Sequence, residues 1–220
     1  MSASITKLTP TSLSALLCAR ICHDLISPVG ALGTAIEILD DPSNVDMHGD
    51  AMDLVRTSSR QASAKLKFLR IALGAGGSAP GVIPTAEVIQ LSNDMFADSK
   101  PDLVWQIASD GIDKNRARIV MNLIMLAIQA APRGGTVTVT RTGPSTGNGE
   151  AAAFSLVSEG PKVRLDAAVA TAISGKAPEN GFDGRSIQPL YASLLAKEIG
   201  GTVGASATED AISFTANFPG

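Results

Sequence analysis

The sequence predicts an α+β fold in two parts: an N-terminal helical hairpin over residues 1–75, then an α/β sandwich over residues 76–220. Apolar residues recur at helical spacing from Leu13 to Leu73, with one interruption at Asp40–Asn44. The glycine-rich stretch GAGGSAPG at 74–81 has the composition of a linker. Beyond it, helix-like and strand-like segments mix without strict alternation, which is typical of a sheet covered by helices.

The hairpin consists of two long amphipathic helices. The first is expected over Leu13–Leu39 with Ser12 as its N-cap, and the second from near Asp46 to about Leu73. The short turn between them makes the two helices antiparallel neighbours. A lone hairpin of this length buries only one stripe of each helix, so we expect a second copy to complete a four-helix bundle. The sequence therefore predicts a homodimer.

The sandwich is expected to contain four helices and five strands. The helices are Thr85–Ala97, a helix capped by Asp113 and ending at Ala130, Leu165–Ile173 and Ser186–Ile199. The strands are Asp102–Ile107, Thr136–Arg141, Ala152–Val157, Thr202–Ser206 and Ala211–Phe218.

Composition excludes several classes of protein. Hydrophobic residues make up 45% of the 220 residues and charged residues 18%, which is typical of a globular chain. A net charge of −3 argues against general nucleic-acid binding. We find no run of about 18 apolar residues, and the start MSASITKLTPTS lacks the pattern of a signal peptide. A cytoplasmic protein without a membrane segment is therefore expected, with its two cysteines reduced.

The segment LCARICHDLISPVGAL at 17–32 holds one of the two histidines. On a helical wheel, the bulky apolar residues lie about 120–200° from His23; they are Ile21, Leu25, Val29, Leu32, Ile36 and Leu39. The face of His23 itself is small or polar apart from Leu16 and carries Ala19, Arg20, Ser27, Gly30, Thr34 and Glu37. This pattern predicts an exposed histidine on a rigid helix.

Metal or haem ligation fits this segment poorly. Haem attachment needs two cysteines separated by two residues, whereas three separate Cys18 from Cys22. Two cysteines and a histidine at i, i+4 and i+5 of a helix cannot all face one zinc ion. We therefore interpret Cys18 and Cys22 as small core residues.

A nucleophilic histidine accounts for more of the segment. A neutral imidazole nitrogen can attack phosphorus, and Asp24 could orient the ring or take its proton. Ser27, four residues on, could contact a phosphoryl oxygen or a water. Pro28 removes a backbone donor and is expected to kink the helix within a turn of His23.

The run His23-Asp24-Leu25-Ile26-Ser27-Pro28 resembles the phospho-acceptor box of sensor histidine kinases. Asn122-Leu123-Ile124-Met125-Leu126-Ala127, followed by Pro132-Arg133-Gly134-Gly135-Thr136-Val137, is similar to the N box of the kinase ATP-binding domain. Leu126 stands where that box has its magnesium-binding asparagine. The resemblance implies a dimeric phospho-acceptor hairpin followed by a degenerate histidine-kinase ATPase-like sandwich.

Both glycine boxes of the kinase resemblance are damaged. Ser158-Glu159-Gly160-Pro161-Lys162 replaces the adenine-binding box, and Gly181-Phe182-Asp183-Gly184-Arg185-Ser186-Ile187 keeps only part of the phosphate-covering loop. Pro161 and Arg185 replace glycines whose small size allows close approach to a nucleotide. Gly200-Gly201-Thr202-Val203 and the closing strand still resemble the end of the kinase domain.

An intact acceptor with a dead nucleotide site resembles the ChpT-type histidine phosphotransferases of bacterial cell-cycle phosphorelays. That resemblance implies transfer from the receiver domain of a hybrid histidine kinase to His23, and onward to the receiver aspartates of response regulators. It implies no cofactor on this chain, with Mg²⁺ held by the partner receiver. The alternatives are an active ATP-dependent histidine kinase and a non-catalytic interaction module of kinase-like fold.

A basic stripe is expected on the second helix, where Arg56, Arg60, Lys67 and Arg70 fall within about 80° of one another. It is either a solvated face or a docking surface that attracts an acidic receiver. With Arg20 beside His23, these residues are the candidate partner-binding residues.

Overall fold

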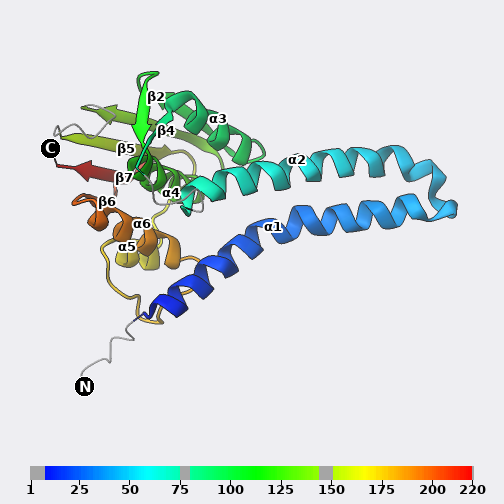
Figure 1. Cartoon of the computed structure of the whole chain (residues 1–220), viewed down its shortest axis with the longest axis horizontal. Coiled ribbons are helices and arrows are strands. Elements are labelled where there is room, and N and C mark those ends of the chain that lie inside the picture. The colour runs from blue at the N-terminus through cyan, green and yellow to red at the C-terminus, as the bar shows by residue number, and fades with distance from the viewer. Residues whose placement is uncertain (1–7, 75–79, 144–150, 220) are drawn as a thin grey trace.

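The computed structural model describes residues 8–74, 80–143 and 151–219. A long helical hairpin projects from a sheet covered by helices (Figure 1). The helices are α1 (Pro10–Asp40), α2 (His48–Ala72), α3 (Thr85–Met95), α4 (Lys114–Ala130), α5 (Ala167–Ile173) and α6 (Ile187–Glu198), with a 3₁₀ turn at Pro42–Met47. The strands are β1 (Val82–Pro84), β2 (Pro101–Gln106), β3 (Gly111–Asp113), β4 (Gly135–Thr142), β5 (Ala152–Glu159), β6 (Thr202–Ala207) and β7 (Ala211–Phe218).

Local chemistry sets the ends of the hairpin helices. Thr9 caps α1 by accepting a hydrogen bond from the backbone N–H of Ser12, and Pro10 follows in the first turn, where no N–H partner is needed. The prediction that Ser12 is the cap is therefore wrong by one turn. At the other end, the Asp41 carboxylate accepts from the N–H of Ser43 and turns the chain through the 3₁₀ segment into α2.

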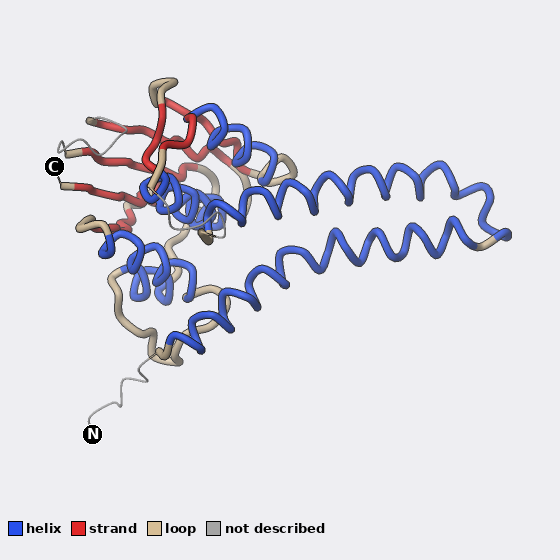
Figure 2. The backbone as a smooth tube through the Cα atoms, viewed as in Figure 1, coloured by secondary structure: helices blue, strands red, loops and turns tan. Residues whose placement is uncertain are grey.

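The main sheet has the strand order β2-β4-β5-β7-β6. Strands β2 and β4 are parallel, and every other neighbouring pair is antiparallel. Figures 1 and 2 show α4, α5 and α6 gathered against one face, so the sandwich has two layers. The predicted α+β class and these five strands are confirmed. The short antiparallel pair of β1 and β3 was not predicted.

Helix α4 lies at the centre of the core. Asp113 caps it as predicted, its carboxylate accepting from the N–H groups of Asn115 and Arg116. Most of the helix is buried, including a continuous run from Ile119 to Ile128. A helix that is apolar nearly all round must be covered on several sides, and here α2, α6 and the sheet supply the cover.

The open end of the hairpin is fastened to the sandwich at two points. At the end of α2, Phe68 and Ala72 are fully buried in the main core, and Phe68 meets the ring of Phe96 edge-on at 5.5 Å. At the start of α1, Leu13 and Leu17 pack with a second cluster on α5 and α6. Because the two attachments are apart, α1 and α2 diverge toward the sandwich, as Figures 1 and 2 show.

Asn122 of α4 holds the end of α2 against the sandwich by hydrogen bonds. Its amide nitrogen donates to the carbonyl oxygens of Ala72 at 2.7 Å and Arg118 at 2.8 Å, and the residue is fully buried. The Ala72 carbonyl belongs to the last turn of α2, where helical carbonyls lack helical partners. Next to it, Tyr191 of α6 donates its hydroxyl to the Leu73 carbonyl and accepts from Arg118. The predicted linker at 74–81 lies largely outside the described residues.

We expect Asn122→Ala to destabilise the protein by about 1–3 kcal/mol, because the buried carbonyl of Ala72 loses its donor. Urea unfolding followed by circular dichroism measures this loss. Asn217→Ala, at an exposed asparagine of β7, is the matched control and should stay within about 0.5 kcal/mol of the parent. Equal stability of the two variants would contradict the role given to Asn122.

Candidate functional site

His23 lies on the middle of α1, where the helix has begun to diverge from α2. Its side chain is 82% exposed, so the prediction of an exposed histidine is confirmed. Ser27, one turn on, is also exposed. The helical wheel placed the apolar stripe of α1 on the side opposite His23. In the structure, one part of that stripe is half-buried and the other part is exposed to solvent. Leu25 and Leu32 are half-buried, whereas Val29 and Ile36 are exposed.

The ring of His23 is held by a short chain of polar contacts. Its Nδ1 lies 3.2 Å from Oδ1 of Asp24, whose side chain is only 11% exposed. The other carboxylate oxygen of Asp24 accepts from Nε of Arg20 at 2.9 Å. When Nδ1 carries the proton and donates it to Asp24, Nε2 keeps a free lone pair. Arg20, predicted as a partner-binding residue, is thus also the residue that orients Asp24.

Lys65 of α2 is a member of this site that the sequence analysis missed. Its ammonium donates to the backbone carbonyl of Asp24 at 2.9 Å. The signal that could have revealed it is Pro28, which lies in the helix interior and is buried. A proline removes the N–H that the carbonyl four residues earlier would receive, so Asp24 needs a donor from another element.

His23 also lines the mouth of a cleft of about 660 Å³ between α1 and the sandwich. Arg20 and Ala19 line the same side, and Leu126, Leu165 and Phe214 give it an apolar floor. Charged residues from two loops complete the wall; they are Arg164, Asp166, Asp183 and Arg185. From the sequence, Arg185 was considered only as a replacement of a kinase glycine, and Arg164 and Asp166 were not predicted. The cleft therefore joins His23 to the region that resembles the kinase nucleotide site.

The residues of that region do not fit Mg²⁺ with a nucleotide. Leu126 offers a hydrocarbon side chain to the cleft where a metal would need an oxygen ligand. Asn122 donates its amide nitrogen to Ala72 and Arg118, so only its buried Oδ1, which has no hydrogen-bond partner among the described residues, is left as an oxygen ligand. In the ranges that the structure describes, no three His, Cys, Asp or Glu side chains gather as a metal site.

Two glycines of this region, Gly135 and Gly160, allow close backbone packing. A Cβ on Gly160 would come within 2.3 Å of the Gly134 carbonyl oxygen, and one on Gly135 within 2.0 Å of the Glu159 carbonyl oxygen. Both have positive φ, so these residues let the loop after β5 cross the start of β4. Gly184, in the other damaged box, meets no neighbouring atom within 4 Å.

Asp183 organises the loop at 181–187, which resembles the phosphate-covering loop of the kinases. Its carboxylate accepts from the hydroxyl and N–H of Ser186 and from the N–H of Arg185. These hydrogen bonds favour the charged form, and the Ser186 hydroxyl is the largest cause of a lowered pKa for Asp183. The loop is thus tied to the start of α6 and has a defined shape on the cleft wall.

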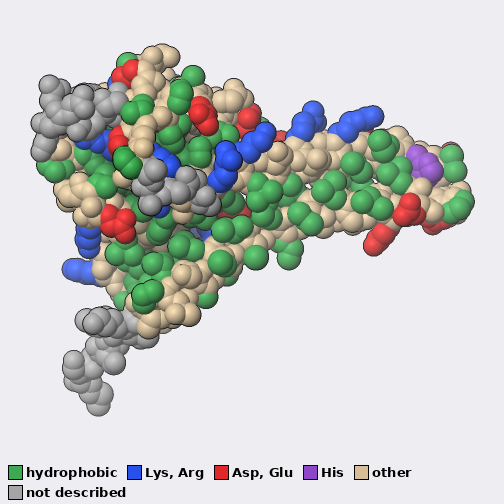
Figure 3. Space-filling model, viewed as in Figure 1, with side chains coloured by type: hydrophobic (Ala, Val, Ile, Leu, Met, Phe, Trp, Pro, Cys, Tyr) green, Lys and Arg blue, Asp and Glu red, His purple; other side chains and the backbone are tan. Residues whose placement is uncertain are grey.

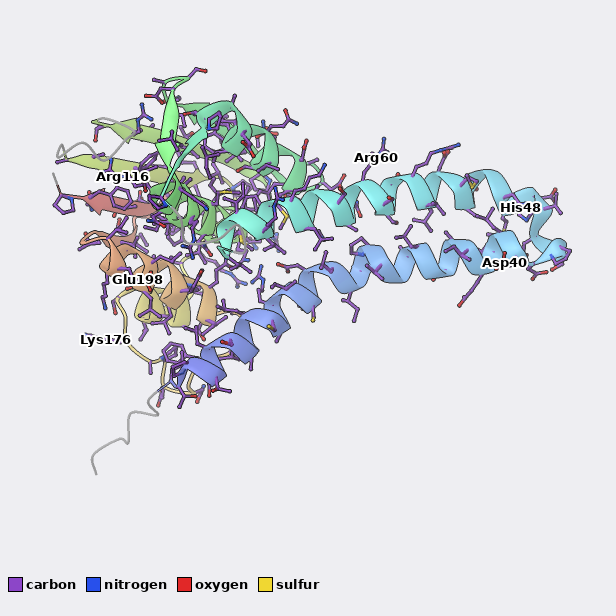
Figure 4. All side chains as sticks on the ribbon, viewed as in Figure 1. Asp40, His48, Arg60, Arg116, Lys176 and Glu198 are labelled. Atoms are coloured by element: carbon purple, nitrogen blue, oxygen red, sulfur yellow. The ribbon has the colours of Figure 1, made fainter. Side chains whose placement is uncertain are left out.

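The predicted basic stripe lies on the side of α2 that faces away from α1. Figure 3 shows Lys and Arg side chains along that edge of the hairpin, and Figure 4 shows Arg60 pointing outward. Arg56 pairs with Asp53 at 2.7 Å, both exposed, while Arg60 and Lys67 border a second hollow between α2 and α3. An exposed pair of this kind adds little stability. Lys67 and Arg70 are exposed as well.

One long side of α1 is apolar and exposed to solvent. We call this the open face of the hairpin; it comprises Cys18, Cys22, Ile26, Val29 and Ile36, which share about 80° of the helix. Ile26 is 71% exposed, and Val29 and Ile36 more than half exposed. Both cysteines are free and exposed, so their interpretation as core residues is wrong for the single chain. Figure 3 shows hydrophobic side chains along the hairpin.

Helix α1 is also long and apolar enough to cross a membrane by length and composition alone. One such helix is weak evidence for a membrane span, and the sequence has no unbroken run of about 18 apolar residues, so the match does not contradict the expectation. In the structure, however, the helix is amphipathic. Arg20, His23 and Asp24 place polar groups within its apolar sequence, and one side of the helix packs on α2.

Comparison with known proteins decides the family. Residues 85–211 match the family model of the histidine phosphotransferase C-terminal domain. The chain belongs to the histidine phosphotransferase family. It is 38% identical over 216 residues to protein phosphotransferase ChpT of Brucella abortus (strain 2308), covering 98% of this chain and all of that protein. This confirms the ChpT-type resemblance read from the sequence.

A solved structure of a bacterial phosphotransferase shares the fold. A bacterial phosphotransferase at 1.7 Å resolution is 36% identical and aligns with a TM-score of 0.82, over 96% of this chain and 98% of that one. The histidine kinase AdeS of Acinetobacter baumannii, 14% identical, aligns with a TM-score of 0.48 over 90% of this chain and 97% of that one.

We expect Asp183→Asn to lower the urea midpoint near pH 6 by the equivalent of under about 1 kcal/mol, since the carboxylate is exposed and screened. Because the folded-state pKa lies below the ordinary 3.8, the contribution is present above pH 3.8 and lost as the pH falls through the folded value. Urea unfolding of parent and variant between pH 6 and pH 3 measures it. A difference that does not shrink below pH 3.8 would contradict the assignment.

Proposed function

We propose that this histidine phosphotransferase relays a phosphoryl group between receiver-domain aspartates through His23. The observation that carries the proposal is the exposed ring of His23 with Nδ1 directed at the nearly buried carboxylate of Asp24. Of the two tautomers of the neutral ring, this contact favours the one with its proton on Nδ1. It leaves Nε2 as the nucleophile, on the side of the ring that solvent and a partner can reach.

The transfer needs little more than positioning of groups in line. The lone pair on Nε2 attacks the phosphorus of an aspartyl phosphate, the phosphorus–nitrogen bond forms, and the phosphorus–oxygen bond to the carboxylate breaks. The aspartate leaves as a carboxylate, and Asp24 stabilises the positive charge that develops on the ring. Reversal at a second receiver passes the group on. Ser27, exposed one turn away, is placed to meet a phosphoryl oxygen.

The chemistry proposed for this chain requires no cofactor of its own. Mg²⁺ belongs to the acidic pocket of the receiver, which holds the phosphoryl oxygens during transfer. The hydrocarbon side chain of Leu126, where a metal would need an oxygen ligand, weighs against the alternative of an ATP-dependent kinase. A non-catalytic interaction module would have no use for the ordered contacts from Arg20 through Asp24 to His23.

The family implies receiver-domain partners in a phosphorelay. We propose that they are the receiver of a hybrid histidine kinase and the receivers of response regulators, as the resemblance suggests. The stripe of Arg56, Arg60, Lys67 and Arg70 would attract their acidic surfaces and speed encounter. Partner choice then depends on surface complementarity around His23.

We further propose that two copies pair through the open face of the hairpin into a four-helix bundle in the cytoplasm. Isolated monomers rarely leave so large an apolar patch in water. The same helix carries Arg20, His23 and Asp24, and charged groups at the centre of a bilayer are costly. Partner helices cover the apolar side without burying these residues, so a second copy suits the face better than a membrane does.

His23→Gln should abolish phosphoryl acceptance, because an amide nitrogen has no available lone pair, while stability stays within about 0.5 kcal/mol of the parent. Asp24→Asn should slow transfer on the order of 100-fold and not abolish it, since the nucleophile remains. Incubation with a receiver domain labelled by ³²P measures both. Acid-labile, base-stable label on the chain identifies phosphohistidine.

His48→Gln is the matched control, because His48 is the other histidine and lies at the far turn of the hairpin (Figure 4). It should accept phosphate like the parent. Label retained by His23→Gln would refute the assignment, and label on no residue would favour the interaction module. Labelling of the parent by ATP and Mg²⁺ alone would favour the kinase.

Pairing through the open face predicts that Cys18 and Cys22 react slowly with maleimide in the native protein. Ile36→Asp should yield a monomer in which both react faster, because a charge cannot be buried at the interface without a partner. Ile36 is 51% exposed in the single chain, so its replacement leaves the hairpin itself intact. Size-exclusion chromatography with light scattering and thiol labelling measure the two effects.

Val104→Asp is the control for that experiment, since Val104 is a partly exposed apolar residue on β2, away from the hairpin. It should remain dimeric. A parent that is monomeric with fast thiols would contradict the pairing, and association of that monomer with lipid vesicles would favour a membrane for the same face.

A further inference from the structure

We infer that Lys65 is a positioning residue for phosphotransfer, because it holds the carbonyl of Asp24 that Pro28 leaves without a helical donor. The inference rests on the proposed role of His23. Lys65 belongs to α2, so it acts on the acceptor site from the neighbouring helix. It touches neither the reacting nitrogen nor the phosphoryl group and works through the backbone next to His23.

The demand for a donor follows from covalent structure. In an α-helix the carbonyl of residue 24 accepts from the N–H of residue 28, and Pro28 has no N–H. Asp24 and Lys65 are half-buried and Pro28 is buried, so water is a poor substitute at this point. The Lys65 ammonium lies 2.9 Å from the carbonyl oxygen, at hydrogen-bond distance.

Lys65 differs from the other basic residues of α2 in the direction it faces. With Ala51, Ser58 and Leu69 it shares the side of α2 that packs toward α1, about 140° or more from the basic stripe. A half-buried ammonium in that position is not part of a docking surface. Its charge is committed to one carbonyl, and a charged donor makes a stronger bond than a neutral one.

The contact completes a clamp on Asp24. Arg20 holds the carboxylate from one turn earlier in the same helix, and Lys65 holds the carbonyl from α2. The carboxylate and the backbone carbonyl of Asp24, which orients His23, are therefore both held by hydrogen bonds. The clamp also ties α1 to α2 beside the proline, where the helix would otherwise be free to bend. Loss of Lys65 should let the turn containing His23 and Asp24 reorient.

Lys65→Met, which keeps most of the length of the side chain and removes the donor, should slow phosphoryl acceptance from a labelled receiver by about 10- to 100-fold, as a misplaced reacting group does. Lys65→Arg, which keeps a charged donor, should restore most of the rate. Lys176→Met is the matched control, because Lys176 is exposed just after α5, away from α2 (Figure 4), and should transfer normally.

A double-mutant cycle tests the pairing with the proline. Pro28→Ala returns an N–H that can satisfy the Asp24 carbonyl within the helix. In that background Lys65→Met should cost less than about threefold, whatever Pro28→Ala costs by itself. An equal loss in both backgrounds overturns the inference, as does unfolding of Lys65→Met that Pro28→Ala does not rescue.

A spectrum of the unphosphorylated protein separates this inference from the proposed function. The chain has two histidines, so the ring signals of His23 and His48 can be assigned in a ¹H–¹⁵N spectrum of the full chain. Lys65→Met should move the His23 ring signals and leave those of His48 in place. Unchanged His23 signals overturn the role of Lys65, even if the parent transfers phosphate. If the parent transfers no phosphoryl group, the proposed function is refuted. The spectrum still tests whether Lys65 positions the His23 ring.

Discussion

The fastening of the hairpin at two separate points is the constraint on which the remaining structure depends. Partly buried leucines at the start of α1 pack against α5 and α6, whereas Phe68 and Ala72 at the end of α2 are buried against α3 and α4. The helices must therefore spread apart as they approach the sandwich. That divergence opens the cleft and places His23 on its lining. Apolar burial at the ends thus determines the geometry of a polar site between them.

Much of this arrangement could be predicted from the sequence. The helical period from Leu13 to Leu73, the cap at Asp113 and the strand pattern of the sandwich are local signals, and the structure confirms the elements they predict. The exposure of His23 also followed from one helix, because its neighbours at three and four residues are small or polar. Where a feature depends on one element alone, periodicity was sufficient.

The features that were wrong or missed depend on contacts between elements. The wheel could not tell which apolar residues of α1 face α2 and which face solvent, so the cysteines were taken for core residues. Lys65 was missed because its partner is a backbone atom 41 residues away in sequence. Thr9 and Ser12 are both good caps, and local composition did not separate them. Strands β1 and β3 are three residues each, too short to show a period.

Asn122 extends the influence of α4 beyond the sandwich. Its amide nitrogen donates to the last turn of α2, so a substitution at this buried position would loosen the end of the hairpin as well as the core around it. The same helix α2 carries Lys65, which contacts the backbone next to His23. A buried residue of the sandwich therefore bears on the surroundings of His23 through the position of α2.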